Sequence, residues 1–160
     1  MTTDTGAVLL AGALGVLGLL AGSFLGLVSL RLPLGEGFVG GRSRCRSCDR
    51  PLEAWRLIPL LSYGVSRVRC AACGAAISLR YPAMELAGAA IGVCAALTQP
   101  TLTAALLTAV LGWQLLLIAV IDGEHFWLPD RLTLPLLATG LLAAATLDRV
   151  SIVESAAGAA

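Results

Sequence analysis

Four of the five cysteines in this 160-residue sequence form two C-x-x-C pairs, Cys45 with Cys48 and Cys70 with Cys73, separated by 21 residues. Each pair supplies two sulfur ligands from one turn, and together they make the four-thiolate set of structural zinc sites. Since four thiolates leave no coordination position for water, we expect a structural zinc ion. Two disulfides or free thiols are the alternatives. Gly74 suits the positive φ that such a turn requires.

A second candidate for chemistry is Asp122, which directly follows the uncharged run L-L-L-I-A-V-I. A carboxylate at or just inside a membrane boundary is costly, so it is a functional candidate by default. The alternative is that Asp122 only marks a helix end among the headgroups, and the residues alone do not decide. Asp130 is predicted to cap the next helix, and Glu124 and His125 are predicted to lie in an interfacial loop. Cys94 lies in an apolar run and is predicted to be buried.

Four apolar runs must position these residues: 7–30, 82–98, 102–121 and 132–147. The sequence is 58% hydrophobic and 13% charged, whereas soluble domains are about a quarter charged. The first run is long enough to cross a hydrocarbon core of about 30 Å. It is too long for a signal peptide and lacks a basic start. We therefore predict an all-α polytopic membrane protein of about four transmembrane helices, with the start of a fifth near S-A-A-G-A-A and a small zinc-ribbon-like domain.

The basic residues predict which side of the membrane holds the cysteines. All 11 basic residues are arginines, and nine of them lie between positions 31 and 80. Loops rich in arginine stay in the cytoplasm, where reducing conditions favour thiolates over disulfides. Alternating helices then bring Asp122 to the same side. A net charge of +1 gives no reason to expect nucleic-acid binding. The nine are Arg31, Arg42, Arg44, Arg46, Arg50, Arg56, Arg67, Arg69 and Arg80.

Smaller features complete the expected architecture. Arg31 and Pro33 are predicted to end the first helix. The small residues Gly22, Ser23 and Gly26 either form a close helix–helix face or are ordinary membrane-helix composition. The apolar residues within 55–63 either build a small core or lie in the headgroup interface. A domain of this size needs the metal as a staple.

At this point the motifs resemble those of the bacterial type IV prepilin peptidases, which are membrane aspartic peptidases. The segment G-S-F-L-G-L-V-S-L-R-L-P at 22–33 is similar to the family's G-S-F-L-N-V-x-I-x-R-L-P, with Gly26 at the usual Asn. The C-x-x-C pairs, I-P-L-L-S-Y at 58–63 and I-S-L-R-Y-P-A-M-E-L at 77–86 resemble its cytoplasmic cysteine domain. The segment I-D-G-E-H-F-W-L-P-D at 121–130 resembles its D-x6-P-D motif.

The resemblance implies a function. Two aspartates on the cytoplasmic side activate water to cut prepilin or pseudopilin leaders, for type IV pili or type II secretion. Many members then N-methylate the new terminus with S-adenosylmethionine. By this resemblance Asp122 is the first catalytic aspartate, the protein lies in the bacterial inner membrane in contact with lipid, and its partners are prepilin leaders. We assign no S-adenosylmethionine residues.

One family motif is missing from this sequence. The second aspartate of the family lies in G-x-G-D, which the sequence does not contain. We therefore expect the N-terminal part of a longer product, inactive alone, with a naturally degenerate member as the alternative. The expected division is a first transmembrane helix at 1–31, the four-cysteine domain at 32–81 and the start of the peptidase domain at 82–160. The competing functions are a methyltransferase-only protein and a non-enzymatic zinc-ribbon anchor of a secretion system.

Overall fold

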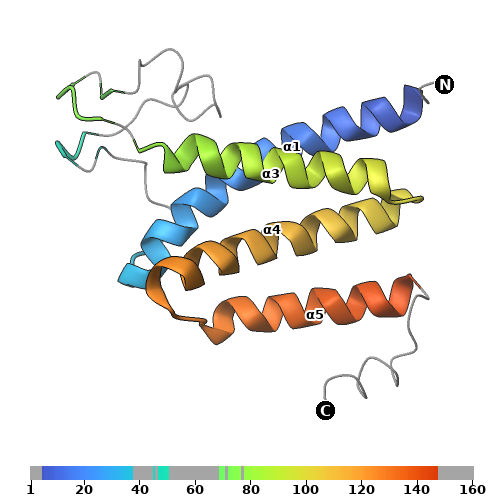
Figure 1. Ribbon diagram of the computed structural model, residues 1–160. Helices are drawn as coiled ribbons and strands as arrows, with labels where there is room; N and C mark the ends of the chain where they lie inside the picture. The colour runs from blue at the N-terminus through green and yellow to red at the C-terminus, as the bar shows by residue number, and fades with distance from the viewer. Residues whose placement is uncertain are drawn as a thin grey trace.

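The protein is a helical bundle with a cysteine-rich segment at one end (Figure 1). The computed structural model describes residues 5–37, 45, 47–50, 69, 70, 72–76 and 78–147. Its elements are α1 (Thr5–Arg31), the short 3-10 helix η1 (Leu32–Leu34), α3 (Arg80–Thr98), α4 (Leu102–His125) and α5 (Asp130–Thr146). Within these described residues, β structure is limited to one antiparallel bridge between Arg69 and Ala76.

The four apolar runs form the four predicted helices. Three of these helices, in the segments Thr5–Leu34, Arg80–Thr98 and Leu102–His125, are long and apolar enough to cross a membrane. The fourth, α5, has 17 residues, which gives a length of about 26 Å, slightly less than a typical hydrocarbon core. The expected start of a fifth helix and the apolar residues at 55–63 lie outside the described residues.

α1 and α3 form the most extensive helix pair of the bundle, and glycines line their contact. A Cβ atom on Gly18 would come within 2.2 Å of the Gly88 carbonyl oxygen, and one on Gly92 within 2.1 Å of the Leu14 carbonyl oxygen. A Cβ atom on Gly22 would come within 2.2 Å of the Met84 carbonyl oxygen. The two backbones therefore touch directly, as small residues allow in membrane helices. Of the two alternatives for Gly22, Ser23 and Gly26, the close helix–helix face is present at Gly22, and it extends about two turns towards the N-terminus, to Leu14.

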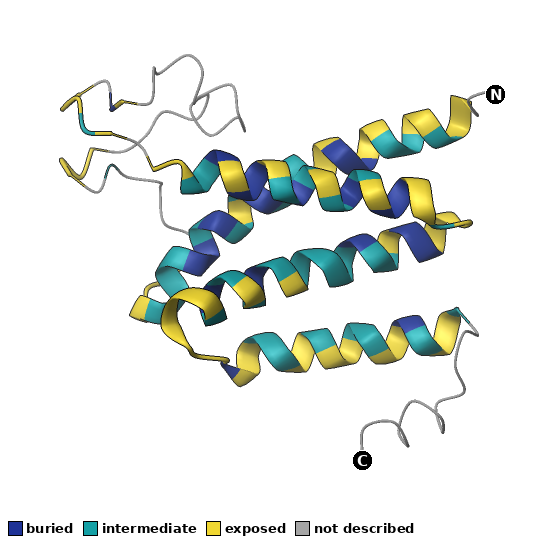
Figure 2. Ribbon diagram, in the orientation of Figure 1, coloured by how far each residue is buried: buried dark blue, intermediate teal, exposed yellow. Residues whose placement is uncertain are grey.

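The remaining helices continue the bundle beyond α3, with α4 packed against α3 and α1 and α5 packed against α4 (Figure 1). The Trp113 indole N–H donates to the Gly88 carbonyl oxygen at 2.9 Å, which joins α4 to α3. The Thr139 hydroxyl lies 2.6 Å from the Gln114 side-chain oxygen, which joins α5 to α4. α5 is the least buried helix, and Ala143 is the one buried residue among Asp130–Thr146 (Figure 2).

The sequence predictions for Cys94 and Asp130 are wrong. Cys94 is exposed rather than buried, because it lies on the outer face of α3, away from the glycine contact with α1. Asp130 does not cap α5, since Pro129 is the N-cap and Asp130 is the first helical residue. There the carboxylate still opposes the positive end of the helix dipole.

Candidate active site and metal centre

The two C-x-x-C pairs fold into equivalent turns. In each turn the first cysteine accepts a hydrogen bond from the backbone N–H four residues later, Asp49 to Cys45 and Gly74 to Cys70, both at 2.8 Å. The N–H of the first cysteine donates to the carbonyl oxygen five residues later, that of Arg50 at 2.9 Å in the first turn and that of Ala75 at 2.8 Å in the second. The residue directly after the second cysteine has a positive φ in both turns, 53° at Asp49 and 70° at Gly74. The positive φ predicted for Gly74 is confirmed.

The two turns bring all four sulfur atoms together. The Sγ atoms of Cys45, Cys48, Cys70 and Cys73 all lie within 4.8 Å of one another. Those of Cys45 and Cys73 are 3.8 Å apart. A tetrahedral zinc site with Zn–S bonds of about 2.3 Å has sulfurs about 3.8 Å apart. None of the four cysteines is disulfide-bonded, and the 3.8 Å between the Cys45 and Cys73 sulfurs exceeds the S–S bond length of about 2.05 Å. The donor set therefore fits a thiolate-bound metal.

Backbone amides around the cluster favour the thiolate form at two sulfurs. The N–H groups of Ala72 and Cys73 lower the pKa of Cys70 to about 6. The N–H groups of Ser47 and Cys48 lower the pKa of Cys45 in the same way. At Cys73 the Ala75 N–H acts in the same direction, but desolvation and the neighbouring thiols outweigh it and raise the pKa to about 11. The backbone amides therefore favour the thiolate form of Cys45 and Cys70, which is the form that binds a metal ion.

Asp122 lies in the last turn of α4. The helix continues to His125, and Phe126 ends it with a φ of 50° and an N–H that donates to the Asp122 carbonyl oxygen at 2.8 Å. The predicted interfacial loop at Glu124 and His125 is therefore helical. Ile121, beside Asp122, is fully buried against Val28 and Leu117, whereas Asp122 itself is half-buried. The carboxylate thus sits on a fixed helical turn at the edge of the packed core.

A polar connection at the same end of the bundle joins three helices. One terminal nitrogen of Arg80, Nη2, donates to the Ser29 hydroxyl of α1 at 2.9 Å. The other, Nη1, forms an ion pair with the Glu124 carboxylate of α4. Arg80 begins α3, so the exit of the cysteine segment and the end of α4 lie on the same side of the bundle. Asp122 and the start of α3, to which the cysteine segment leads, therefore lie at one end of the bundle, as predicted, and the membrane side of that end stays a prediction.

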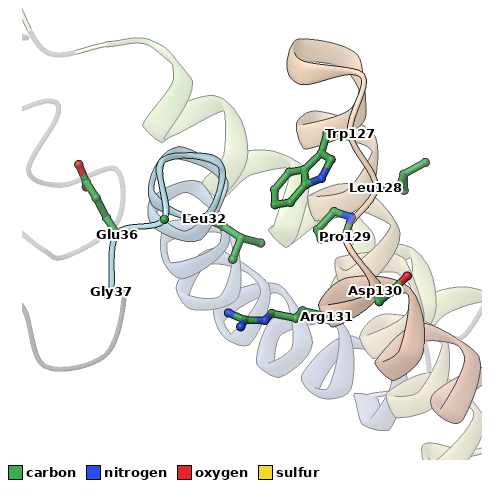
Figure 3. A pocket seen from close by; sticks show the side chains of 9 residues that line it. Leu32, Glu36, Gly37, Trp127, Leu128, Pro129, Asp130 and Arg131 are labelled. Atoms are coloured by element: carbon green, nitrogen blue, oxygen red, sulfur yellow. The ribbon is translucent and has the colours of Figure 1, made fainter.

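The same end carries a cavity of about 700 Å³ between η1 and the loop that joins α4 to α5 (Figure 3). Leu32 faces Trp127 and Pro129 across it, and Glu36, Asp130 and Arg131 lie at its edges. Asp122 is not among its lining residues. The cavity therefore does not indicate a role for Asp122, and the indication comes from the D-x6-P-D motif that Asp122 opens.

The sequence pointed to the cysteines and to Asp122 as candidates, and it missed the connection through Ser29, Arg80 and Glu124. Ser29 lies in an otherwise apolar run and Arg80 was counted among the loop arginines. The spacing of these residues carries no signal, because three separate helices supply them. Asp49 was missed as well, since aspartate adopts positive φ less often than glycine.

The fold defines a polytopic membrane protein with a small module whose four cysteine sulfurs are spaced as metal ligands. The family model described as "Bacterial Peptidase A24 N-terminal domain" matches residues 16–99. The model described as "Type IV leader peptidase family" matches residues 109–160. The chain belongs to the bacterial A24 peptidase family, as its motifs predicted.

Relatives named prepilin leader peptidase/N-methyltransferase match over most of the chain. The one from Myxococcus xanthus is 40% identical over 91% of this chain and 43% of its own length. The one from Stutzerimonas stutzeri is 39% identical over 79% of this chain and 52% of its own length. The chain thus spans about half the length of the curated relatives it matches. No solved structure shows significant similarity to it.

Proposed function

We propose that this chain supplies the first of the two catalytic aspartates, Asp122, of a prepilin leader peptidase. The observation that carries the proposal is the place of this carboxylate: it opens the D-x6-P-D segment, inside the region matched by the type IV leader peptidase family model. It also lies in a helical turn at the end of the bundle where Arg80 leads into α3. The proposed substrates are prepilin leaders, which the names of the relatives mention, and pseudopilin leaders, which the resemblance of the motifs implies.

The proposed reaction is peptide hydrolysis by two carboxylates that share one proton. The ionised carboxylate removes a proton from water, whose oxygen attacks the scissile carbonyl carbon. The protonated carboxylate then gives its proton to the leaving amine as the C–N bond breaks. Asp122 provides one of these groups. The sequence contains no G-x-G-D motif to provide the other, so we expect the 160-residue chain alone to cleave no leader.

We propose that the four cysteines hold a structural zinc ion, because their spacing and sulfur separations fit tetrahedral coordination. Zinc would supply the cross-link between the two turns that so small a module needs. The names of the relatives support an N-methyltransferase activity as well, and the resemblance of the motifs implies S-adenosylmethionine as its methyl donor. We place the arginine-rich segment, and with it Asp122, on the cytoplasmic side of the bacterial inner membrane. The proposed division remains 1–31, 32–81 and 82–160.

The experiment joins this chain to a C-terminal segment that carries the family's G-x-G-D motif. Leader cleavage is then measured with the purified chain, the fusion and two variants of the fusion. We expect no cleavage by the chain alone and cleavage by the fusion. Asp122→Asn should lower the rate by about 100- to 10,000-fold, the usual contribution of one acid–base group. Glu36→Gln, which neutralises an exposed carboxylate after η1, is the matched control. An Asp122→Asn fusion as active as its parent would refute the proposal.

A further inference from the structure

The polar connection through Arg80 takes no direct part in the proposed peptide hydrolysis. Arg80 is the first residue of α3 and lies seven positions after Cys73. Its side chain is 18% exposed, and its Nε is buried without a hydrogen-bond partner among the described residues. The guanidinium is therefore inserted between the helices rather than extended into solvent. A charge placed in this way is costly unless its partners are fixed.

The partner in α1 is the most deeply buried polar side chain of the described residues. Ser29 has 0% exposure, and its hydroxyl donates to the Gly26 carbonyl oxygen at 2.9 Å. A hydroxyl that donates one hydrogen bond can still accept another, and it accepts the bond from Arg80 at 2.9 Å. The Ser29 hydroxyl therefore both donates and accepts a hydrogen bond, and these two bonds fix the direction in which the guanidinium points.

The partner in α4 lies two residues beyond Asp122. Glu124 belongs to the last helical turn, which Phe126 closes by donating its N–H to the Asp122 carbonyl oxygen. The ion pair that holds the Glu124 carboxylate therefore also restrains the helical turn that carries the Asp122 side chain. The planar guanidinium holds its two donors in a rigid fork, so one residue can fix this turn relative to α1.

We propose that Arg80 is a positioning residue, which ties the turn carrying Asp122 to α1 and to the start of α3, where the cysteine module joins the bundle. The proposal rests on the function proposed above. It assigns Arg80 no contact with the substrate. Its effect is to hold one carboxylate in the geometry that a two-carboxylate reaction requires, and misplacement by about 1 Å can cost about 100-fold in rate.

The first test needs no activity and uses the 160-residue chain in detergent. Amide hydrogen exchange is compared between the parent, Arg80→Ala, Glu124→Gln and the control Arg131→Ala, which removes an exposed arginine at the same end. We expect faster exchange confined to the last turn of α4 in the first two variants, and parent-like exchange in the control. Unchanged exchange at this turn in Glu124→Gln, or a uniform increase across all helices in that variant, would overturn the proposal.

The second test uses the fusion with the G-x-G-D segment and separates kcat from KM. We expect Arg80→Ala to lower kcat by about 10- to 100-fold and to leave KM within about twofold, the pattern of an interaction that serves only the transition state. Arg80→Lys should be intermediate, because an ammonium keeps the ion pair but not the fork. The charge exchange Arg80→Glu with Glu124→Arg should recover part of the loss.

The two proposals fail in different ways. If Asp122→Asn is inactive while Arg80→Ala retains the parent kcat, the positioning proposal alone is wrong. If Asp122→Asn cleaves at the parent rate, the proposed function is wrong, and the exchange experiment still decides whether Arg80 fixes the end of α4.

Discussion

At the scale of single residues, the two cysteine turns have the same backbone hydrogen bonds. Each turn has a positive φ at the residue after its second cysteine, and that residue differs between the turns. Gly74 has a φ of 70° and Asp49 a φ of 53°. The sequence predicted the glycine, because glycine adopts positive φ without cost. It did not predict Asp49, which reaches the same region only because its turn is fixed by the same two backbone hydrogen bonds.

This comparison gives a prediction about Gly74→Ala. A Cβ atom at Gly74 would meet nothing within 4 Å, so the cost comes from the backbone conformation alone, about 1–2 kcal/mol. We expect zinc affinity, measured by competition with a chelator, to fall by about 10-fold. The control is Gly12→Ala, since Gly12 also faces open space but lies inside α1. Equal zinc affinity in Gly74→Ala and the parent would show that the turn carries no strain.

The thiols give a prediction about pH. The amides of Ala72 and Cys73 lower the pKa of Cys70 to about 6, from an ordinary value of 9.0. The folded, metal-free cluster therefore binds fewer protons than the unfolded chain between these values, so its stability should fall as the pH is lowered from 9 to 6. In a Cys94→Ser chain stripped of zinc, thiolate absorbance should show a step near pH 6 that Cys70→Ser removes. A single step near pH 9 for all four thiols would contradict the assignment.

At the scale of elements, the lengths of the apolar runs predicted the helices. Which face each helix buries depends on the neighbouring helices, and the sequence of one run does not show this. Gly18 and Gly88 look like ordinary small residues in the sequence, but they face each other where α1 and α3 touch. The end of α4 was misplaced for a related reason. Glu124 and His125 are polar and look like loop residues, but Arg80 of α3 pairs with Glu124 on the last turn.

Substitutions at this helix contact test the packing. A methyl group on Gly88 would come within 2.2 Å of the Gly18 carbonyl oxygen, a backbone atom that no rotamer change can move. We expect Gly88→Ala to destabilise the bundle by about 1–3 kcal/mol, measured by thermal unfolding in detergent. Gly140→Ala in α5, where a methyl group meets nothing within 4 Å, should not lower stability. Equal melting temperatures for the two variants would argue against direct backbone contact.

At the scale of the whole molecule, helix alternation brings the start of α3 and the end of α4 to one end, and the turn between α3 and α4 to the other (Figure 1). The number of apolar runs predicted this shared side, because two helices that each cross the membrane once separate the cysteine segment from the end of α4. The identity of the membrane side does not follow from the bundle and still rests on the arginines.

The orientation can be measured by labelling introduced cysteines with a membrane-impermeant maleimide in intact spheroplasts, in a Cys94→Ser background. Pro100→Cys lies in the exposed turn between α3 and α4, and Trp127→Cys in the loop after α4. We expect Pro100→Cys to be labelled from outside, and Trp127→Cys only after the membrane is permeabilised. The reverse pattern would place the cysteine module outside the cytoplasm and would contradict the proposed function.

The most direct test of the central claim, that Asp122 is a peptidase residue, compares two activities of one protein. In the fusion carrying the G-x-G-D segment, leader cleavage is measured on intact prepilin and methyl transfer on pre-cleaved pilin. We expect Asp122→Asn to lower leader cleavage by about 100- to 10,000-fold and to leave methylation at the parent level. Parent-level cleavage by Asp122→Asn would contradict this claim, and so would an equal loss of both activities, which would make Asp122 a structural residue.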